Sequence, residues 1–122
     1  MTTELSYQKA IDLLKRCSSN HGFLASAQSI SNYKRVWARD GVICGLAALA
    51  SGDAQLIDTF KKTLETLAQH QHSCGTIPSN VAYVQDVAEV SYGGLAGRVD
   101  AVSWYIIGHC QYAYATNNAA WI

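Results

Sequence analysis

Hydrophobic positions recur at helical spacing in the first part of the chain. In residues 3–18 they are Leu5, Ile11, Leu14 and Cys17, and the charged side chains on the other side are Lys9, Asp12, Lys15 and Arg16. One apolar and one charged face are typical of an amphipathic helix that packs on a core. We therefore expect a helix over residues 3–18 with one face in water.

A different pattern follows this segment. Residues 19–37 are rich in Ser and Asn and contain His21 and Gly22, which is typical of a long loop. Asp40 can then cap a second helix. The residues from Val42 to Ala50 in that helix leave no polar stripe. A helix without a polar face is expected to be buried on all sides.

A tight turn is predicted at Gly52 and Asp53, because glycine commonly ends a helix and aspartate commonly starts one. The third helix carries one apolar stripe, and Asp58 can pair with Lys62 one turn later. Two helices joined this closely are expected to form an antiparallel hairpin. The stripe consists of Leu56, Ile57, Phe60, Leu64 and Leu67.

The same order then repeats. A second long loop is predicted from about His72 to Gly97, and residues 98–116 are again apolar all round. Because each long loop precedes an apolar helix, the loops should gather at one end of the helices. We predict an all-α fold for residues 1–122, in which outer amphipathic and inner apolar helices alternate. A plain four-helix bundle would instead have four helices of similar amphipathicity.

Composition restricts the kinds of partner. The 122 residues are 49% hydrophobic and 15% charged, with nine basic and nine acidic side chains, so the chain is expected to be globular. Zero net charge disfavours a nucleic acid or an anionic membrane as partner. The N-terminus lacks the pattern of a secretory signal, and no apolar run reaches membrane-spanning length. The four cysteines are widely spaced, so we expect reduced thiols in the cytoplasm and no metal site.

Charged side chains stand where the two apolar helices begin. They are Arg39 and Asp40 in one segment and Arg98 and Asp100 in the other, and Trp37 lies beside the first pair. Loops on a rigid scaffold commonly carry binding and catalytic residues, so a site for a polar substrate is expected there. Structural roles are the alternative: Asp40 as a helix cap, Asp100 as a favourable first-turn charge, and Trp37 as a core aromatic.

Three stretches carry a resemblance to a known family. The segments WARDGVI and VDAVSWY, preceded by GTIPSN, resemble motifs of the amylo-α-1,6-glucosidase domains of bacterial glycogen-debranching proteins. Neutral and alkaline invertases are similar to these domains. The resemblance covers essentially the whole chain. It implies about two hairpins of an (α/α)6 toroid, and an inverting glycoside hydrolase whose sugar pocket lies at the loop-bearing end.

The resemblance also implies a role for each residue. Asp100 matches the general acid that protonates the leaving glycosidic oxygen, while Arg39 and Asp40 match residues that hold sugar hydroxyls. Trp37 matches an aromatic wall of the same subsite, which covers the apolar face of a pyranose. A general acid must hold its proton near the working pH, and the nearby Arg98 opposes this. Arg98 is kept among the substrate-binding candidates.

One part of the family's machinery is not found. An inverting enzyme needs a second carboxylate, which in the family lies far downstream. We expect Asp86 and Glu89 to be solvated loop charges, and Tyr92 to lie near the glycan. The chain is therefore expected to be the N-terminal portion of a longer domain, inactive without its further hairpins. The expected substrate is an oligosaccharide or glycogen-like polymer, with no cofactor. A sucrose-cleaving invertase and a non-catalytic module that binds carbohydrate or protein are the alternatives.

Overall fold

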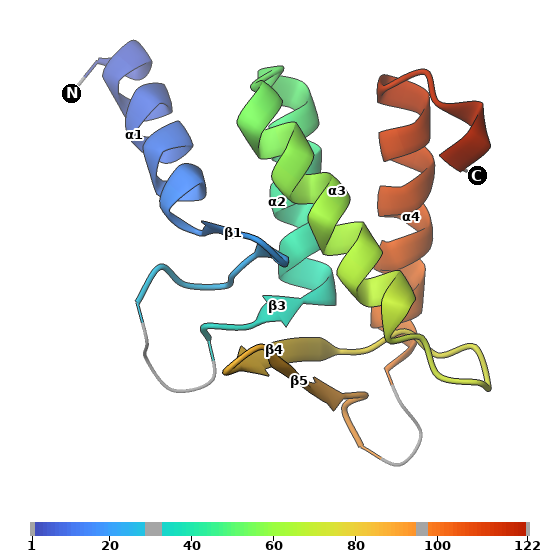
Figure 1. The fold of residues 1–122 in the computed structure, drawn as a ribbon. Coiled ribbons are helices and arrows are strands. Elements are labelled where there is room, and N and C mark those ends of the chain that lie inside the picture. The colour runs from blue at the N-terminus through green and yellow to red at the C-terminus, as the bar shows by residue number, and fades with distance from the viewer. Residues whose placement is uncertain (1, 29–32, 95–97, 122) are drawn as a thin grey trace.

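The computed structural model describes residues 2–28, 33–94 and 98–121. Within these ranges there are four α-helices, one short 3-10 helix and five strands (Figure 1). The helices are α1 (Thr3–Arg16), α2 (Ala38–Ser51), α3 (Ala54–Gln69), α4 (Val99–Ala115) and η1 (Ala119–Trp121). The strands are β1 (Ser18–Ser19), β2 (Gly22–Phe23), β3 (Val36–Trp37), β4 (Asn80–Val84) and β5 (Val87–Ser91). The parts of the expected loops at 29–32 and 95–97 lie outside the described residues.

The prediction of an all-α toroid portion is wrong, because both segments expected to be loops contain strands. Strands β1 and β2 form one antiparallel pair, and β3, β4 and β5 form a three-stranded antiparallel sheet in that order. The fold is therefore mixed, with helices and two small sheets. Strands β4 and β5 are rich in valine, which favours extended backbone. Their two-residue turn places Gln85 and Asp86 at positive φ, as a tight hairpin turn requires.

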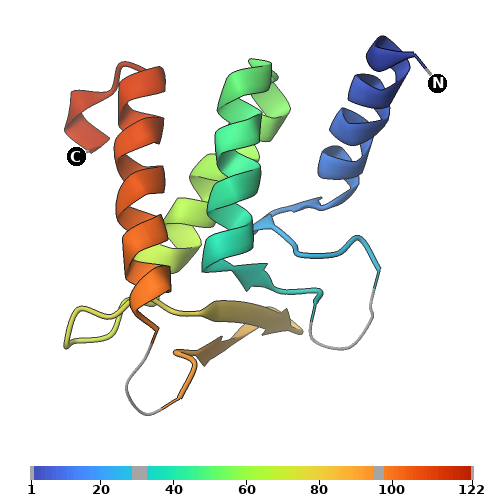
Figure 2. The same ribbon diagram turned by 180° about the vertical axis from the view of Figure 1, so that it is seen from behind.

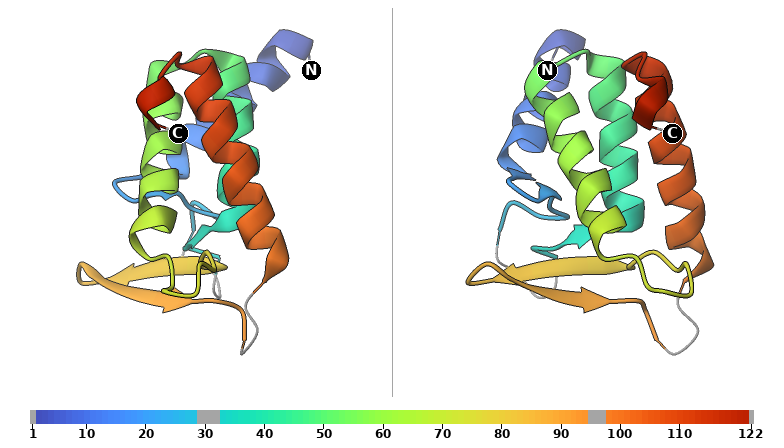
Figure 3. Two further views of the ribbon diagram at one scale, coloured as in Figure 1. Left: turned by 90° about the vertical axis from the view of Figure 1, so that its right-hand side faces the viewer. Right: turned by 45° about the vertical axis from the view of Figure 1, so that its right-hand side comes forward.

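The helices stand side by side above the three-stranded sheet. Figures 1 and 3 show the sheet across one end of α2, α3 and α4, and both chain ends toward the opposite end. The long segments before α2 and α4 thus lie at the same end of the molecule. This common placement puts the first turns of α2 and α4 at the sheet.

Close packing joins α2 to α3. A Cβ atom added to Gly45 of α2 would lie 2.0 Å from the Phe60 ring of α3, and one added to Gly41 would lie 2.7 Å from the Thr63 methyl group. Phe60 is fully buried and meets Tyr112 of α4 edge to face, with ring centroids 5.9 Å apart. Glycine on α2 therefore lets one aromatic ring of α3 reach the centre of the core.

The expectation that α2 and α4 are buried on all sides is wrong for the described residues. Ile43 of α2 is 46% exposed, and Ile106 of α4 is 56% exposed. Helix α3 covers one face of the α2 and α4 pair, and Figure 2 shows the opposite face of the ribbon uncovered by the described elements. An apolar composition predicted burial, but the described residues supply packing partners on only one side of these helices.

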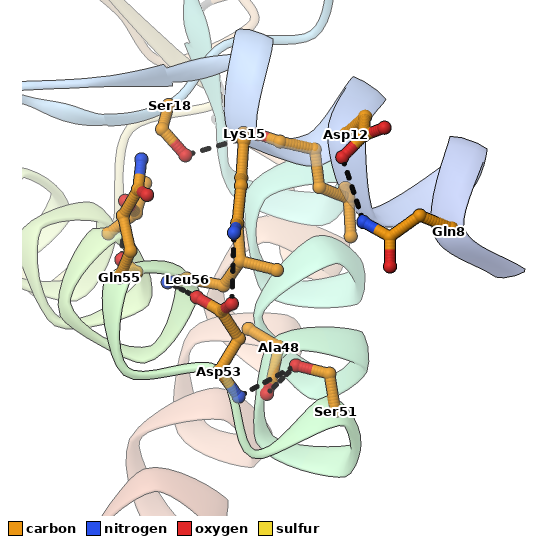
Figure 4. Close-up of polar contacts among 11 residues, drawn as sticks. Gln8, Asp12, Lys15, Ser18, Ala48, Ser51, Asp53, Gln55 and Leu56 are labelled. Carbon is orange, nitrogen blue, oxygen red and sulfur yellow. Dashed lines mark hydrogen bonds and ion pairs between the residues drawn. The ribbon is translucent and has the colours of Figure 1, made fainter.

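Asp53 caps α3, as the sequence predicts. Its carboxylate accepts a hydrogen bond of 3.1 Å from the Leu56 backbone N–H and lies 3.1 Å from Lys15 Nζ of α1 (Figure 4). The Leu56 hydrogen bond, followed by Lys15, lowers the pKa of the Asp53 carboxyl. Asp53 therefore ties α1 to the turn between α2 and α3. The predicted pair of Asp58 with Lys62 is also confirmed, at 3.0 Å.

The lowered pKa of Asp53 predicts how stability depends on pH. An unfolded aspartate has a pKa of about 3.9. The stability contributed by Asp53 is present above that pH and is lost as the pH falls through the lower folded pKa. Asp53→Ser keeps a cap but removes the charge. We expect the native chain to have the higher urea midpoint at neutral pH, and the two midpoints to converge under acid conditions. A constant difference at every pH would contradict this role.

Candidate functional site

Strand pairing sets the start of α2. Trp37 ends β3 opposite Asn80 of β4, and the Ala38 N–H donates to the Ser79 carbonyl at 3.0 Å. Trp37 has extended backbone at the helix N-cap, and α2 begins at the next residue. Asp40 thus lies within the first turn, so the prediction that it caps the helix is wrong. The β3–β4 pair fixes Arg39 and Asp40 at the sheet end of α2.

The start of α4 is held in the same region. Arg98 is its N-cap residue, and Asp100 lies in the first turn. A Cβ atom on Gly93 would lie 2.3 Å from Arg98 Nε, so the guanidinium stem packs directly over that glycine. A small buried cluster below the two helix starts holds them in place. It consists of Ala38, Leu67, Ile77 and Ala101.

An ion pair links the two segments. Arg39 Nη1 lies 3.2 Å from Asp100 Oδ2, although the residues are 61 positions apart in the chain. The two side chains are 62% and 45% exposed. Exposed ion pairs contribute about 0–1 kcal/mol to folding, so this pair adds little to stability. The ion pair matters for the site because it places a guanidinium and a carboxylate beside each other at the protein surface.

The five charged and aromatic candidates line one small cavity. Its volume is about 40 Å³, enough for very few water molecules. Ligand-binding pockets of known proteins have volumes of about 300–1,000 Å³, so the described residues provide a patch of a site rather than an enclosed sugar pocket. The sequence reasoning missed Ser79, although it lies in the quoted GTIPSN segment. The lining residues are Trp37, Ala38, Arg39, Asp40, Ser79, Arg98, Asp100 and Ala101.

The chemistry of this patch suits a polar, uncharged ligand. Two guanidinium groups can donate hydrogen bonds, and two carboxylates can accept them. The first turns of α2 and α4 add backbone N–H groups and a partial positive charge. Two cations and two anions balance, so the patch favours a ligand with many hydroxyl groups over one with a net charge.

Three other acid or aromatic candidates do not line this cavity. The Tyr92 hydroxyl donates to the His70 carbonyl at 2.7 Å, and its ring meets His72 edge to face. Asp86 lies in the turn of the β4–β5 hairpin, and Glu89 lies in β5 opposite Ala82. The described structure therefore offers no carboxylate beside Asp100 other than Asp40 within the cavity lining.

The cysteines divide into two groups. Cys17 is buried and Cys44 is half-buried, whereas Cys74 and Cys110 are exposed. Burial raises the pKa of the Cys44 thiol to about 11 and also raises that of Cys17. Within the described ranges no group of three His, Cys, Asp or Glu residues could hold a metal ion. The cavity lining itself contains no thiol.

This division predicts the order of thiol modification. The thiolate is the reactive form, so a raised pKa and burial both slow the reaction. We expect Cys74 and Cys110 to react first with a disulfide reagent at about pH 8. Cys17 and Cys44 should react only after unfolding in urea. Mass spectrometry of the labelled peptides measures the order, and early labelling of Cys44 would contradict the packing of α2.

No protein-family model, curated protein or solved structure matches this chain. The resemblance to glycogen-debranching proteins therefore depends on the three quoted stretches alone. The geometry adds that all three stretches contribute to one patch, since residues from each line the same cavity. No described helix is both long enough and apolar enough to cross a bilayer.

Proposed function

We propose that this chain forms part of the substrate site of a cytoplasmic inverting glycoside hydrolase that cleaves α-glucosidic linkages, of the amylo-α-1,6-glucosidase type. The observation that supports it best is the Arg39 to Asp100 contact at 3.2 Å. It brings together the two stretches that resemble the family's motifs. The proposed substrate is an oligosaccharide or a glycogen-like polymer with α-1,6 branches.

In this proposal Asp40 and the two arginines bind sugar hydroxyls, and Asp100 is the general acid. A carboxylate can accept hydrogen bonds from two neighbouring hydroxyls, and a guanidinium can hold that carboxylate in place. Trp37 lines the same cavity and provides an apolar ring for a pyranose face. These residue types are the ones that recognition of a neutral sugar requires.

The role of general acid requires Asp100 to carry a proton and to donate it to the glycosidic oxygen. Asp100 Oδ2 lies 3.2 Å from Arg39 Nη1, so the carboxyl must leave this contact before it can donate a proton to a sugar oxygen. Asp40 lines the same cavity and is the other carboxylate that Arg39 could bind. We propose that Arg39 binds Asp40 when Asp100 is protonated beside the glycosidic oxygen. The described residues around the cavity supply no catalytic base and no enclosing walls, so they are not expected to hydrolyse glycosides by themselves.

The test is an Asp100→Asn substitution in the longest natural form of the protein that contains this sequence. General acid catalysis contributes about 10²–10⁴-fold to rate, so isomaltose hydrolysis should fall at least about a hundredfold. Isomaltose binding should change little, because asparagine keeps the shape of the side chain. Asp12→Asn, an exposed change on α1, is the control. Hydrolysis that persists in Asp100→Asn would contradict the proposal, and a preference for sucrose over isomaltose would favour the invertase alternative.

A non-catalytic carbohydrate-binding or protein-binding module is the second candidate. The observation that favours it is the small cavity of about 40 Å³, with Asp100 already paired to Arg39. Such a module would bind isomaltose without hydrolysing it in any longer product. In that case Asp100→Asn would weaken binding, whereas the hydrolase proposal requires binding to persist.

A further inference from the structure

A second pocket lies along β4, apart from the cavity at Asp100. The β1–β2 pair, the segment before β3 and strand β4 form its walls, and Figure 1 shows these elements close together at the sheet end of the molecule. Its volume is about 200 Å³, and it shares no lining residue with the cavity at Asp100. The lining residues are Ser19, His21, Leu24, Lys34, Val81 and Tyr83.

The rings in this pocket are held rigidly. His21 and Tyr83 stack with their centroids 3.5 Å apart and their planes 8° from parallel. The backbone of His21 is fixed on both sides, because its carbonyl accepts from Thr66 Oγ1 at 2.6 Å and its N–H donates to Ser19 Oγ at 3.2 Å. The Tyr83 hydroxyl lies 3.2 Å from His70 Nε2. A preformed wall of this kind lowers the entropy cost of binding a ligand.

Two polar side chains of the pocket, those of Lys34 and His21, have no hydrogen-bond or ion-pair partner among the described residues, whereas the Ser19 hydroxyl donates to the Gly22 carbonyl. Lys34 forms no ion pair with any described carboxylate. The ring nitrogens of His21 likewise have no hydrogen-bond partner among the described residues, and none of the lining side chains is acidic. The ammonium group of Lys34 thus places one positive charge, and the His21 imidazole an N–H donor, beside the apolar surface of Leu24 and Tyr83. An anion with an apolar body complements this surface.

We propose that this pocket binds a small organic carboxylate. The carboxylate faces Lys34 and His21, and a ring-sized apolar body lies against Leu24 and the Tyr83 ring. The volume sets the size, because an engineered cavity of about 150 Å³ in another protein holds benzene. A pocket of about 200 Å³ has room for one aromatic ring and one carboxylate, but not for an oligosaccharide. This ligand class differs from the neutral sugar proposed for the Asp100 patch.

Benzoate is the probe, and benzyl alcohol is its neutral counterpart of similar size. In amide NMR titrations of the chain, benzoate should cause saturable shifts at Ser19, Leu24 and Val81, with little change at Arg39 and Asp100. Benzyl alcohol should bind at least about tenfold more weakly, since it lacks the charge that makes a charge-assisted hydrogen bond with Lys34. Lys34→Met should weaken benzoate binding by a similar factor and leave benzyl alcohol binding unchanged. Lys9→Met, an exposed change on α1, is the control.

Three results would overturn the proposal. Benzoate could fail to produce saturable shifts at these residues. Benzyl alcohol could bind as tightly as benzoate, or Lys34→Met could bind benzoate as well as the native chain does. A fold check on the variant keeps the test decisive, since the amide spectrum of Lys34→Met should match the native spectrum away from the pocket. Failure of isomaltose to bind at the Asp100 patch would not affect this result, because the two pockets share no residue.

Discussion

Phe60→Ala is expected to lower the free energy of unfolding by about 3–5 kcal/mol. The ring is fully buried and fills the space that Gly45 leaves on α2, and its edge meets the ring of Tyr112 on α4. Removing it leaves a cavity between three helices, and Gly45 offers no side chain to fill that cavity. The loss therefore includes both the buried area and the missing contacts on all sides.

Urea denaturation of three chains measures this effect. Phe60→Leu should lose less than Phe60→Ala, because leucine fills part of the space. Lys61→Ala, at the next position and partly exposed, should change the free energy of unfolding by less than about 0.5 kcal/mol. Equal losses for Phe60→Ala and Lys61→Ala would show that the core of α2, α3 and α4 is not packed as described.

Thr63→Val is expected to cost about 1–3 kcal/mol, although valine has nearly the same shape as threonine. The Thr63 hydroxyl is fully buried, accepts from the Phe23 N–H at 2.9 Å and donates to the Thr59 carbonyl at 3.0 Å. A Cβ atom on Gly22 would lie 2.4 Å from that hydroxyl, so the β1–β2 pair rests directly on α3. Valine would leave the Phe23 N–H buried without an acceptor.

Thr63→Ser is the matched control, because serine keeps the hydroxyl and removes only a methyl group. Chemical denaturation should show Thr63→Ser losing about 0.8 kcal/mol, the value of one buried methyl group, and Thr63→Val losing more. Hydrogen exchange of the Phe23 amide should accelerate in Thr63→Val. Native-like exchange of that amide in Thr63→Val would mean that the hydroxyl does not hold the β1–β2 pair on α3.

The helices could be predicted from the sequence because their signals are local. The apolar period of residues 54–69 and the cap at Asp53 are each contained within one or two turns. Strands β1, β2 and β3 are two residues long, too short to show an alternating pattern, and β3 pairs with the distant strand β4, so no local pattern marks them. The β4–β5 hairpin does have a local signal in its valines and its two-residue turn. The glycines on either side of the hairpin, Gly75 and Gly93, favour a loop in the same segment.

Burial of α2 and α4 was harder to predict. Composition shows that a helix lacks a polar face, but it does not show what covers each side. Ile43 and Ile106 are exposed although both lie in strongly apolar helices. Burial depends on which other elements cover a helix, and the sequence of the helix itself does not contain that information.

The common location of the candidate residues could be predicted from the sequence. Trp37, Arg39 and Asp100 belong to two segments that are distant in sequence, and the pattern of loops before apolar helices placed them at one end. The structure brings them to one cavity, and Ser79 joins them because the β3–β4 pair holds it against the start of α2. Tyr92 lies outside the cavity because its hydroxyl is bound to the His70 carbonyl. Side-chain contacts of this kind depend on tertiary packing, which no local pattern reports.

The most direct test is an NMR titration of this chain with isomaltose, followed at backbone amides and at side-chain N–H groups. Even a Kd of about 10 mM, corresponding to roughly 3 kcal/mol of binding free energy, would saturate at about 100 mM sugar. We predict shifts confined to residues 37–40, Ser79 and residues 98–101, including the side-chain N–H groups of Trp37 and Arg39. Shifts at one of the two segments without the other, or no shifts at that concentration, would contradict a shared sugar site.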